Sequence, residues 1–285
     1  LVNLRRLTSA TDRGIASYFA RHYVLAHPAD RMSRERRLLV RELSRRRDAA
    51  TSPPTSTNTA STADAPPLLC QNPSGPALIS TPEDEAIASE RVSRQLAMMP
   101  FPYISIDLEG PRLGSTGHIS CLQLCVPAIA HEPALVYVYD ILACGHGALG
   151  RDGEHTLRRI LSDPRVVKIF HSCYGDTAAL HRGHGISTRG IFDTSVADSV
   201  CLGRPANKQR GLGTVLRAWL GEAQVKLTYK DTLVHTETFW DIRPLENYKF
   251  IYAYEDVTYC GELYQRLRQQ LSLDGTLELV FALSQ

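Results

Sequence analysis

Residues 104–110 read Ile-Ser-Ile-Asp-Leu-Glu-Gly and end a run rich in apolar and β-branched side chains. Such a run predicts a buried β-strand, and in a strand residues i and i+2 point to the same face. Asp107 and Glu109 are therefore expected side by side, where two carboxylates repel each other and lose solvation. A hard divalent cation removes both penalties, because such cations prefer oxygen ligands. The alternative is a strand that simply ends at solvent in Asp-x-Glu.

A further carboxylate, Asp256, lies on a long helix predicted over residues 244–271. One face of this helix carries, at helical spacing, Tyr252, Asp256, Tyr259, Cys260, Leu263 and Leu267. A buried carboxylate needs a partner, so Asp256 is expected to meet either a cation or an Arg or Lys from elsewhere in the fold. Tyr252 lies one turn earlier, which directs its hydroxyl toward the same site.

A third polar cluster follows a predicted strand at residues 166–171. Asp176 falls in the first turns of the next helix, where it would complement the helix dipole even without any ligand. His171 ends the strand and is a candidate for nucleic-acid contact; a hydrogen-bonded structural histidine is the alternative.

The order of the elements predicts an α/β fold with a mixed sheet of five or six strands. Strands are expected at 102–109, 117–126, 134–141, 166–171 and 190–193, and helices at 82–97, 154–162, 174–183, 194–202, 211–220 and 244–271. Three strands in close succession indicate an antiparallel meander, and the later strand–helix alternation indicates parallel strands flanked by helices.

Three regions are predicted along the chain of 285 residues. Residues 1–48 form a basic extension with a helix over 30–48, residues 49–80 a Ser/Thr/Pro/Ala-rich linker, and residues 81–285 a globular domain. Residues 1–50 hold twelve Arg, no Lys and five acidic residues, so the overall charge of +2 divides into +7 there and −5 in the remainder. This asymmetry suits a protein that meets a polyanion through selected surfaces; a solvated charged helix is the alternative.

Composition narrows the class of protein further. With 43% hydrophobic and 22% charged residues, the chain resembles a globular protein, and no run approaches the ~18 apolar residues that predict a membrane span. Its seven cysteines show no C-x-x-C pair, which favours reduced thiols in an intracellular compartment. An acid-poor, Arg- and Ser-containing first stretch hints at a mitochondrial targeting remnant, with cytoplasm or nucleus as alternatives.

A basic loop supplies candidates for phosphate contact. It contains Arg204, Lys208 and Arg210, and Lys226 and Lys230 follow. Arg243 is a further candidate for nucleic-acid binding, just before the long helix. A solvated loop is the alternative for these residues.

Taken together, the three acidic segments resemble the 3′–5′ exonucleases of the ribonuclease H-like fold called DEDD nucleases, in the subgroup with a tyrosine. The motifs occur in order as Asp107-Leu-Glu109, Asp176 and Tyr252-Ala-Tyr-Glu-Asp256. The surroundings also look like ribonuclease D and Egalitarian-like proteins: Phe192-Asp193-Thr194, Gly211-Leu-Gly213 and Trp240-Asp-Ile-Arg243-Pro244-Leu245. The resemblance covers about residues 98–272.

The resemblance implies hydrolysis of phosphodiester bonds with two divalent cations, Mg²⁺ or Mn²⁺. By analogy Asp107 bridges the two ions, Glu109 and Asp256 complete the shell of the first, and Asp176 serves the second. Tyr252 would orient the attacking water.

Two classes of function follow from the resemblance. One is an active exonuclease on single-stranded RNA, with DNA as a possible substrate. The other is a nuclease-fold scaffold or RNA-binding subunit that docks into a ribonucleoprotein assembly through the basic N-terminal arm. Because no catalytic carboxylate is missing, the enzyme is favoured. A polymerase proofreading domain is disfavoured, since no polymerase sequence is attached.

Overall fold

The computed structural model describes residues 76–285 except 115, 131, 146, 151–152, 154–155, 206–207, 222–235 and 237. The predicted helix at 30–48 and most of the predicted linker lie outside the described residues, as do Lys226 and Lys230. Within the described part, no helix is both long enough and apolar enough to cross a membrane.

The sheet contains β1 (Ala77–Ile79), β2 (Tyr103–Glu109), β3 (Cys121–Val126), β4 (Leu135–Asp140), β5 (Val167–Phe170) and β6 (Ile191–Asp193). The described helices are α3 (Pro82–Ala97), α4 (Ile141–Cys144), α5 (Gly147–Gly150), α6 (Leu157–Ser162), α7 (Tyr174–His184), α8 (Thr194–Cys201), α9 (Leu212–Leu220), α10 (Asn247–Thr258), α11 (Cys260–Leu273) and α12 (Leu277–Leu283), with a short 3-10 helix η2 (Phe239–Asp241).

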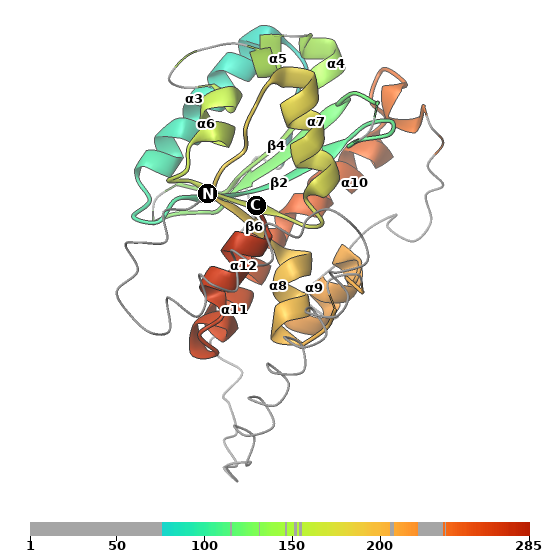
Figure 1. Cartoon of the computed structure of the whole chain (residues 1–285). Coiled ribbons are helices and arrows are strands. Elements are labelled where there is room, and N and C mark those ends of the chain that lie inside the picture. Colours follow the sequence, from blue (N-terminus) through green and yellow to red (C-terminus); the bar gives the residue numbers. More distant parts are fainter. Residues whose placement is uncertain are drawn as a thin grey trace.

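The six strands form one mixed sheet in the order β1-β4-β3-β2-β5-β6. Strands β2, β3 and β4 make an antiparallel meander, whereas β5 and β6 add to β2 in parallel. Figure 1 shows α3, α6 and α7 on one face of this sheet and α10 on the other. The predicted mixed α/β sheet flanked by helices is confirmed.

Alternation along β2 places its side chains in two different environments. Ile104, Ile106 and Leu108 are at most 3% exposed and join the core that α3, α6 and α7 cover. Burying each such side chain stabilises the fold by roughly 1.5–3 kcal/mol. The intervening residues, including Asp107 and Glu109, therefore point to the face on which α10 packs against β2, β3 and β4. The apolar register of β2 thus fixes the direction of its carboxylates.

Two features differ from the prediction. Strand β1 pairs in parallel with β4, although its residues fall in the stretch predicted as linker; three residues are too few to show a period. The predicted helix over 244–271 is two helices divided at Tyr259. The division arises because α10 packs on the meander, while α11 packs mainly against α8 and α9.

Candidate metal centre

Three carboxylates from β2 and α10 come together at one site. Each of Asp107, Glu109 and Asp256 offers an oxygen atom, and these oxygen atoms all lie within 4.8 Å of one another. Asp256 is 5% exposed, and Asp107 and Glu109 are half-buried. Like charges this close are unfavourable in a partly buried site, and a shared cation relieves the repulsion. The donor set is all oxygen, which fits Mg²⁺ or Mn²⁺ better than Zn²⁺.

Asp176 enters from the first turn of α7 and does not belong to that group of three. It is 8% exposed, and no hydrogen bond or ion pair to its carboxylate is found within the described part of the chain. Burial, followed by the negative charge of Asp193, raises the pKa of Asp176 to about 7. A nearby cation would favour the ionised form of this buried carboxylate. Asp176 is therefore suited to be an additional metal ligand.

A tight turn positions the start of α7. Ser172 has a φ of 64°, and its backbone N–H donates to Asp193 Oδ1 at 2.9 Å while that of Cys173 donates to Asp193 Oδ2 at 2.9 Å. The same carboxylate caps α8 by accepting from the N–H of Ser195. Asp193 therefore joins β6, α7 and α8. In the sequence, Asp193 is part of the family context Phe192-Asp193-Thr194, and nothing there reveals that it joins these three elements.

The loop that follows β2 contacts the start of α7, the helix that carries Asp176. Gly114 has a φ of 79°, and a Cβ on it would lie 2.8 Å from the Cα of Gly175, the residue before Asp176. This contact between the loop and α7 requires glycine, both for its conformation and for its lack of a side chain.

Tyr252 lies one turn before Asp256 on α10, as predicted. Its ring packs against Trp240 of η2, with ring centroids 5.8 Å apart and planes inclined at 56°. Two flat side chains in contact restrict the Tyr252 ring, so its hydroxyl has a defined direction on the helix face that carries Asp256.

His171 is held by contacts within the fold. Its Nδ1 is 2.9 Å from the hydroxyl oxygen of Thr194, and its Nε2 is 2.9 Å from the backbone oxygen of Arg210. Because a carbonyl only accepts, Nε2 carries the hydrogen. These contacts match the structural alternative for His171; its contact with nucleic acid stays a prediction.

Two of the predicted phosphate-binding arginines form internal ion pairs. Arg210 pairs with the fully buried Asp198, which also accepts from the indole of Trp219. Arg243 Nε lies 2.6 Å from Asp140, and the same guanidinium donates to the backbone oxygens of Trp240 and Ser120. The structural role of both arginines is therefore clear, and their nucleic-acid contact stays a prediction.

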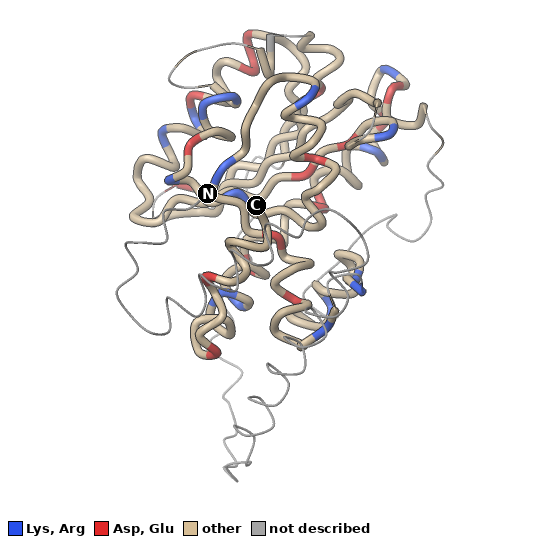
Figure 2. Tube along the Cα trace, in the orientation of Figure 1, with Lys and Arg blue, Asp and Glu red and all other residues tan. Residues whose placement is uncertain are grey.

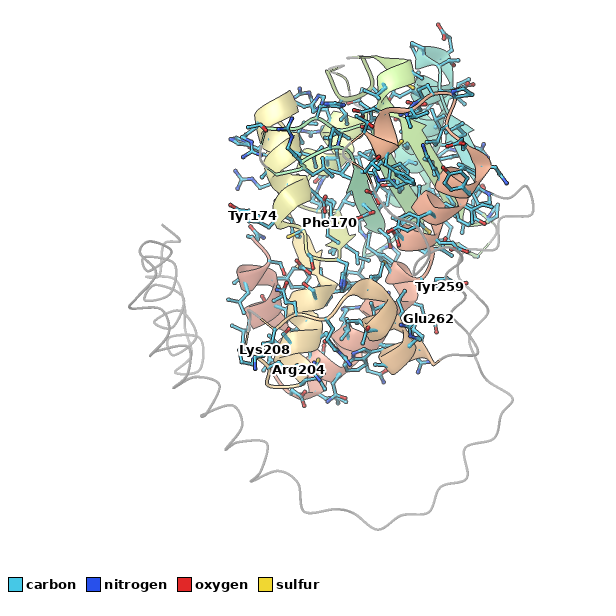
Figure 3. All side chains as sticks on the ribbon, turned by 90° about the vertical axis from the view of Figure 1, so that its right-hand side faces the viewer. Phe170, Tyr174, Arg204, Lys208, Tyr259 and Glu262 are labelled. Carbon is cyan, nitrogen blue, oxygen red and sulfur yellow. The ribbon has the colours of Figure 1, made fainter. Side chains whose placement is uncertain are left out.

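Arg204 and Lys208 present their side chains differently. Both are exposed on the loop after α8, and Figure 3 shows them close together at one end of the molecule. Ion pairs to them are not found among the described residues. Figure 2 shows acidic positions near the lower end of α7.

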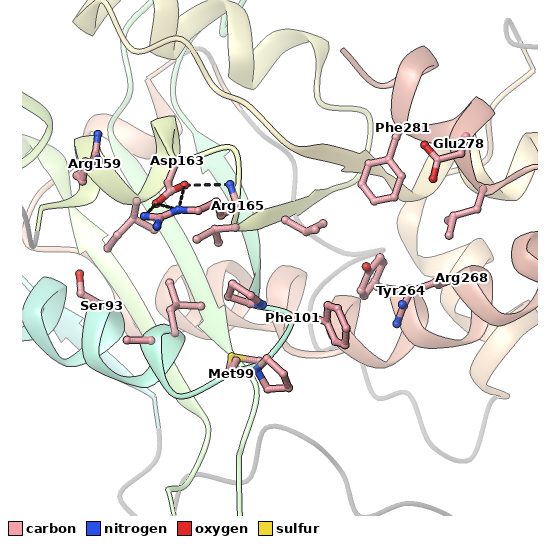
Figure 4. Close-up of a pocket in the computed structure, with 18 residues that line it drawn as sticks. Ser93, Met99, Phe101, Arg159, Asp163, Arg165, Tyr264, Arg268, Glu278 and Phe281 are labelled. Carbon is pink, nitrogen blue, oxygen red and sulfur yellow. Dashed lines mark hydrogen bonds and ion pairs between the residues drawn. The ribbon is translucent and has the colours of Figure 1, made fainter. Parts of the chain in front are cut away.

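A large cavity lies away from the carboxylates. It has a volume of about 810 Å³ and is lined in part by Phe101, Arg165, Tyr264, Arg268 and Phe281 (Figure 4). None of the predicted catalytic residues lines it. The cavity and the carboxylate cluster are therefore separate features of the described structure.

The sequence of this chain is similar to those of known proteins. A family model described as 3′-5′ exonuclease matches residues 79–272. Ribonuclease D of Gluconacetobacter diazotrophicus is 30% identical over 206 residues, which cover 72% of this chain and 45% of that protein. Exosome complex exonuclease RRP6 of Saccharomyces cerevisiae is 31% identical over 121 residues, covering 42% of this chain and 15% of that protein. The chain thus spans less than half the length of the ribonuclease D proteins that it matches.

A solved structure agrees with these sequence matches. The crystal structure of Escherichia coli RNase D superposes with a TM-score of 0.55 and 22% identity, covering 73% of this chain and 48% of that one. At this identity the likeness shows the fold, which is the predicted ribonuclease H-like α/β fold. The family model covers nearly all of the sheet and both elements that carry the clustered carboxylates. The chain therefore belongs to the 3′–5′ exonuclease family.

Proposed function

We propose that the chain is a metal-dependent 3′–5′ exonuclease that hydrolyses single-stranded nucleic acid, RNA in particular. The observation that carries the proposal is the meeting of Asp107, Glu109 and Asp256, whose oxygen atoms lie within 4.8 Å although β2 and α10 are far apart in sequence. RNA is supported by the relatives named ribonuclease D and by the E. coli RNase D, which is described as an exoribonuclease involved in structured RNA processing.

The reaction adds water to a phosphodiester. A bond forms between the water oxygen and phosphorus, the bond from phosphorus to the 3′ oxygen breaks, and the departing 3′ oxygen takes up a proton. Two divalent cations would supply electrostatic stabilisation of the charge that develops on the phosphate oxygens. Asp107, Glu109 and Asp256 would hold one of them, and Asp107 with Asp176 the other. We propose Mg²⁺ or Mn²⁺ for both positions.

Tyr252 has a different task from the carboxylates. Its hydroxyl lies on the helix face of Asp256 and its ring is restricted by Trp240, so it is suited to orient the attacking water through a hydrogen bond. Orientation of the water is therefore the contribution that we propose for Tyr252.

The direct test uses the purified chain with 5′-labelled single-stranded RNA and DNA in Mn²⁺ or Mg²⁺. Stepwise shortening from the 3′ end, abolished by EDTA, is the expected result, with RNA degraded faster than DNA. A 3′-labelled strand should lose its label in the first step. If both polymers stay intact with both metals, the enzyme proposal fails and the scaffold or RNA-binding role is supported instead.

The basic loop yields a separate prediction. Lys208→Ala and Arg204→Ala should each weaken RNA binding about equally for all sequences, because a lost phosphate contact carries no base information. The slope of log K against log[salt] should fall by about 0.7 per contact for single strands. Binding titrations at several salt concentrations measure both quantities.

Arg243→Ala serves as the comparison for the two loop variants, because it removes an arginine that forms an internal ion pair. Removal of its guanidinium leaves the buried Asp140 carboxylate without this cation, at a cost on the order of 2 kcal/mol in the free energy of unfolding. The melting temperature should therefore fall for Arg243→Ala and remain unchanged for the loop variants. A loop variant that binds RNA like the wild type, with the same salt slope, removes that residue from the interface.

Localisation and assembly rest on the sequence alone. Residues 1–48, which carry the basic arm and the mitochondrial hint, lie outside the described residues. We propose that this arm docks the chain into a larger ribonucleoprotein complex, in mitochondria or in another compartment.

A further inference from the structure

One fully buried amide in the sheet has no explanation in core packing. Gln123 lies in the middle of β3, in the sequence Cys-Leu-Gln-Leu-Cys-Val, and is 0% exposed. Neither its Oε1 nor its Nε2 has a hydrogen-bond partner among the described residues. Buried amides in native proteins are nearly always paired, so an unpaired one marks a functional group or an ion or water that is not shown.

The register of the sheet places Gln123 beside the metal centre. In the antiparallel pairing of β2 with β3, Gln123 is directly opposite Asp107, and Cys121 is opposite Glu109. Side chains that face each other across two antiparallel strands lie on the same face, with Cβ atoms about 4.5–5.5 Å apart. The Gln123 amide therefore lies on the α10 face of the sheet, within reach of the Asp107 carboxylate.

The other neighbours of Gln123 on this face are apolar. Val138 is its partner on β4, and Val138 packs in a cluster with Ala253 of α10. The adjacent Cys125 on β3 packs with Val257 of α10. A Met or Leu side chain would fill this space without burying an amide, so the need to fill the core does not account for glutamine.

We propose that Gln123 is a positioning residue for Asp107. The described structure does not contain a hydrogen bond between the two side chains. With a cation bound, the Gln123 Nε2–H would donate to one oxygen of the Asp107 carboxylate and leave its other lone pairs for the cation shared with Glu109 and Asp256. A carboxylate only accepts hydrogen bonds, so the Nε2 end of the amide faces it. Ligating carboxylates are commonly oriented by such second partners, and losing the partner weakens metal affinity or activity by about 10–100-fold. The inference rests on the proposed function, because it requires a cation at the carboxylates.

The test compares Gln123→Met with the wild-type chain without any RNA. Calorimetric titration with Mn²⁺ should give a dissociation constant about 10–100-fold larger for the variant. The melting temperature in EDTA should be unchanged or higher, since the variant buries no amide. A merely structural glutamine predicts the opposite pattern: a lower melting temperature and unchanged metal affinity. Gln123→Leu serves if the Met variant does not fold.

Leu122→Met is the matched control, because it makes a similar change on the same strand but on the opposite face, within the core under α3. It should bind Mn²⁺ like the wild type. If Gln123→Met also binds Mn²⁺ like the wild type, the inference is overturned and the proposed function stands. If the wild-type chain itself binds no Mn²⁺, the proposed metal centre fails and the inference fails with it.

Discussion

Asp107→Asn is expected to lower the rate of RNA shortening by more than a hundredfold while leaving the chain folded. The amide keeps the shape of the side chain but removes the charge of a residue whose carboxylate oxygen lies within 4.8 Å of those of Glu109 and Asp256. Loss of a ligand should exceed the 10–100-fold effect of losing a partner of a ligand. Initial rates on 5′-labelled RNA at saturating Mn²⁺ measure the effect.

Stability provides the second readout for this variant. Removing one of three clustered negative charges relieves repulsion of about 3 kcal/mol per pair at an effective dielectric constant near 20. The melting temperature of Asp107→Asn in EDTA should therefore equal or exceed that of the wild type. A protein that fails to fold would show the reverse, which separates loss of chemistry from loss of structure.

Asp274→Asn is the matched control, because Asp274 is exposed at the end of α11 and its side chain accepts hydrogen bonds only from Gln270 in the described structure. It should retain full activity. Wild-type rates for Asp107→Asn at saturating metal would show that the clustered carboxylates do not carry the reaction.

The parts of the fold that could be predicted are those with local periodicity. The alternation of Ile104, Ile106 and Leu108 with polar residues is visible in the sequence, and it decides which face receives Asp107. The break at Tyr259 could not be seen, because the apolar spacing from Tyr252 to Leu267 continues without interruption. Periodicity shows which side chains are buried, but not that α10 and α11 are buried against different neighbours.

The same limit applies to the site. Asp107, Glu109 and Asp256 could be selected because each is a carboxylate in an apolar stretch, which is unfavourable without a partner. The ion pair of Arg243 with Asp140 could not be foreseen, since the partners come from distant segments. Arg210 and Asp198 are only 12 residues apart, but their pairing depends on how the loop after α8 folds back, which periodicity does not show. Gln123 is visible as the polar residue of an apolar strand, but its relation to Asp107 depends on the strand register.

Asp176→Asn is expected to stabilise the metal-free chain above pH 7 and to have no such effect near pH 4. Burial and the charge of Asp193 raise the pKa of Asp176 from 3.8 to about 7. Between these values the native chain binds a proton that the unfolded chain has released, so stability falls as pH rises through about 7. The full difference is about 4 kcal/mol at most, at 1.36 kcal/mol per pH unit.

The amide of Asp176→Asn cannot ionise, so this loss of stability is absent from the variant. Melting curves in EDTA from pH 4 to pH 8 should diverge, with the variant higher by several degrees at pH 8. Asp274→Asn should follow the wild-type profile throughout. Parallel profiles for the wild type and Asp176→Asn would contradict a buried carboxylate that must lose its proton near neutrality.

Adding Mg²⁺ at pH 8 should reverse the order of the two proteins. A cation at the site favours the ionised carboxylate and stabilises the wild type by mass action, whereas the neutral amide gains less. The rise in melting temperature with Mg²⁺ should therefore be larger for the wild type than for Asp176→Asn. Asp176 would then lower the stability of the metal-free fold at neutral pH and raise the stability of the metal-bound fold. Equal rises for both proteins would place Asp176 outside the metal shell, even with Asp107, Glu109 and Asp256 inside it.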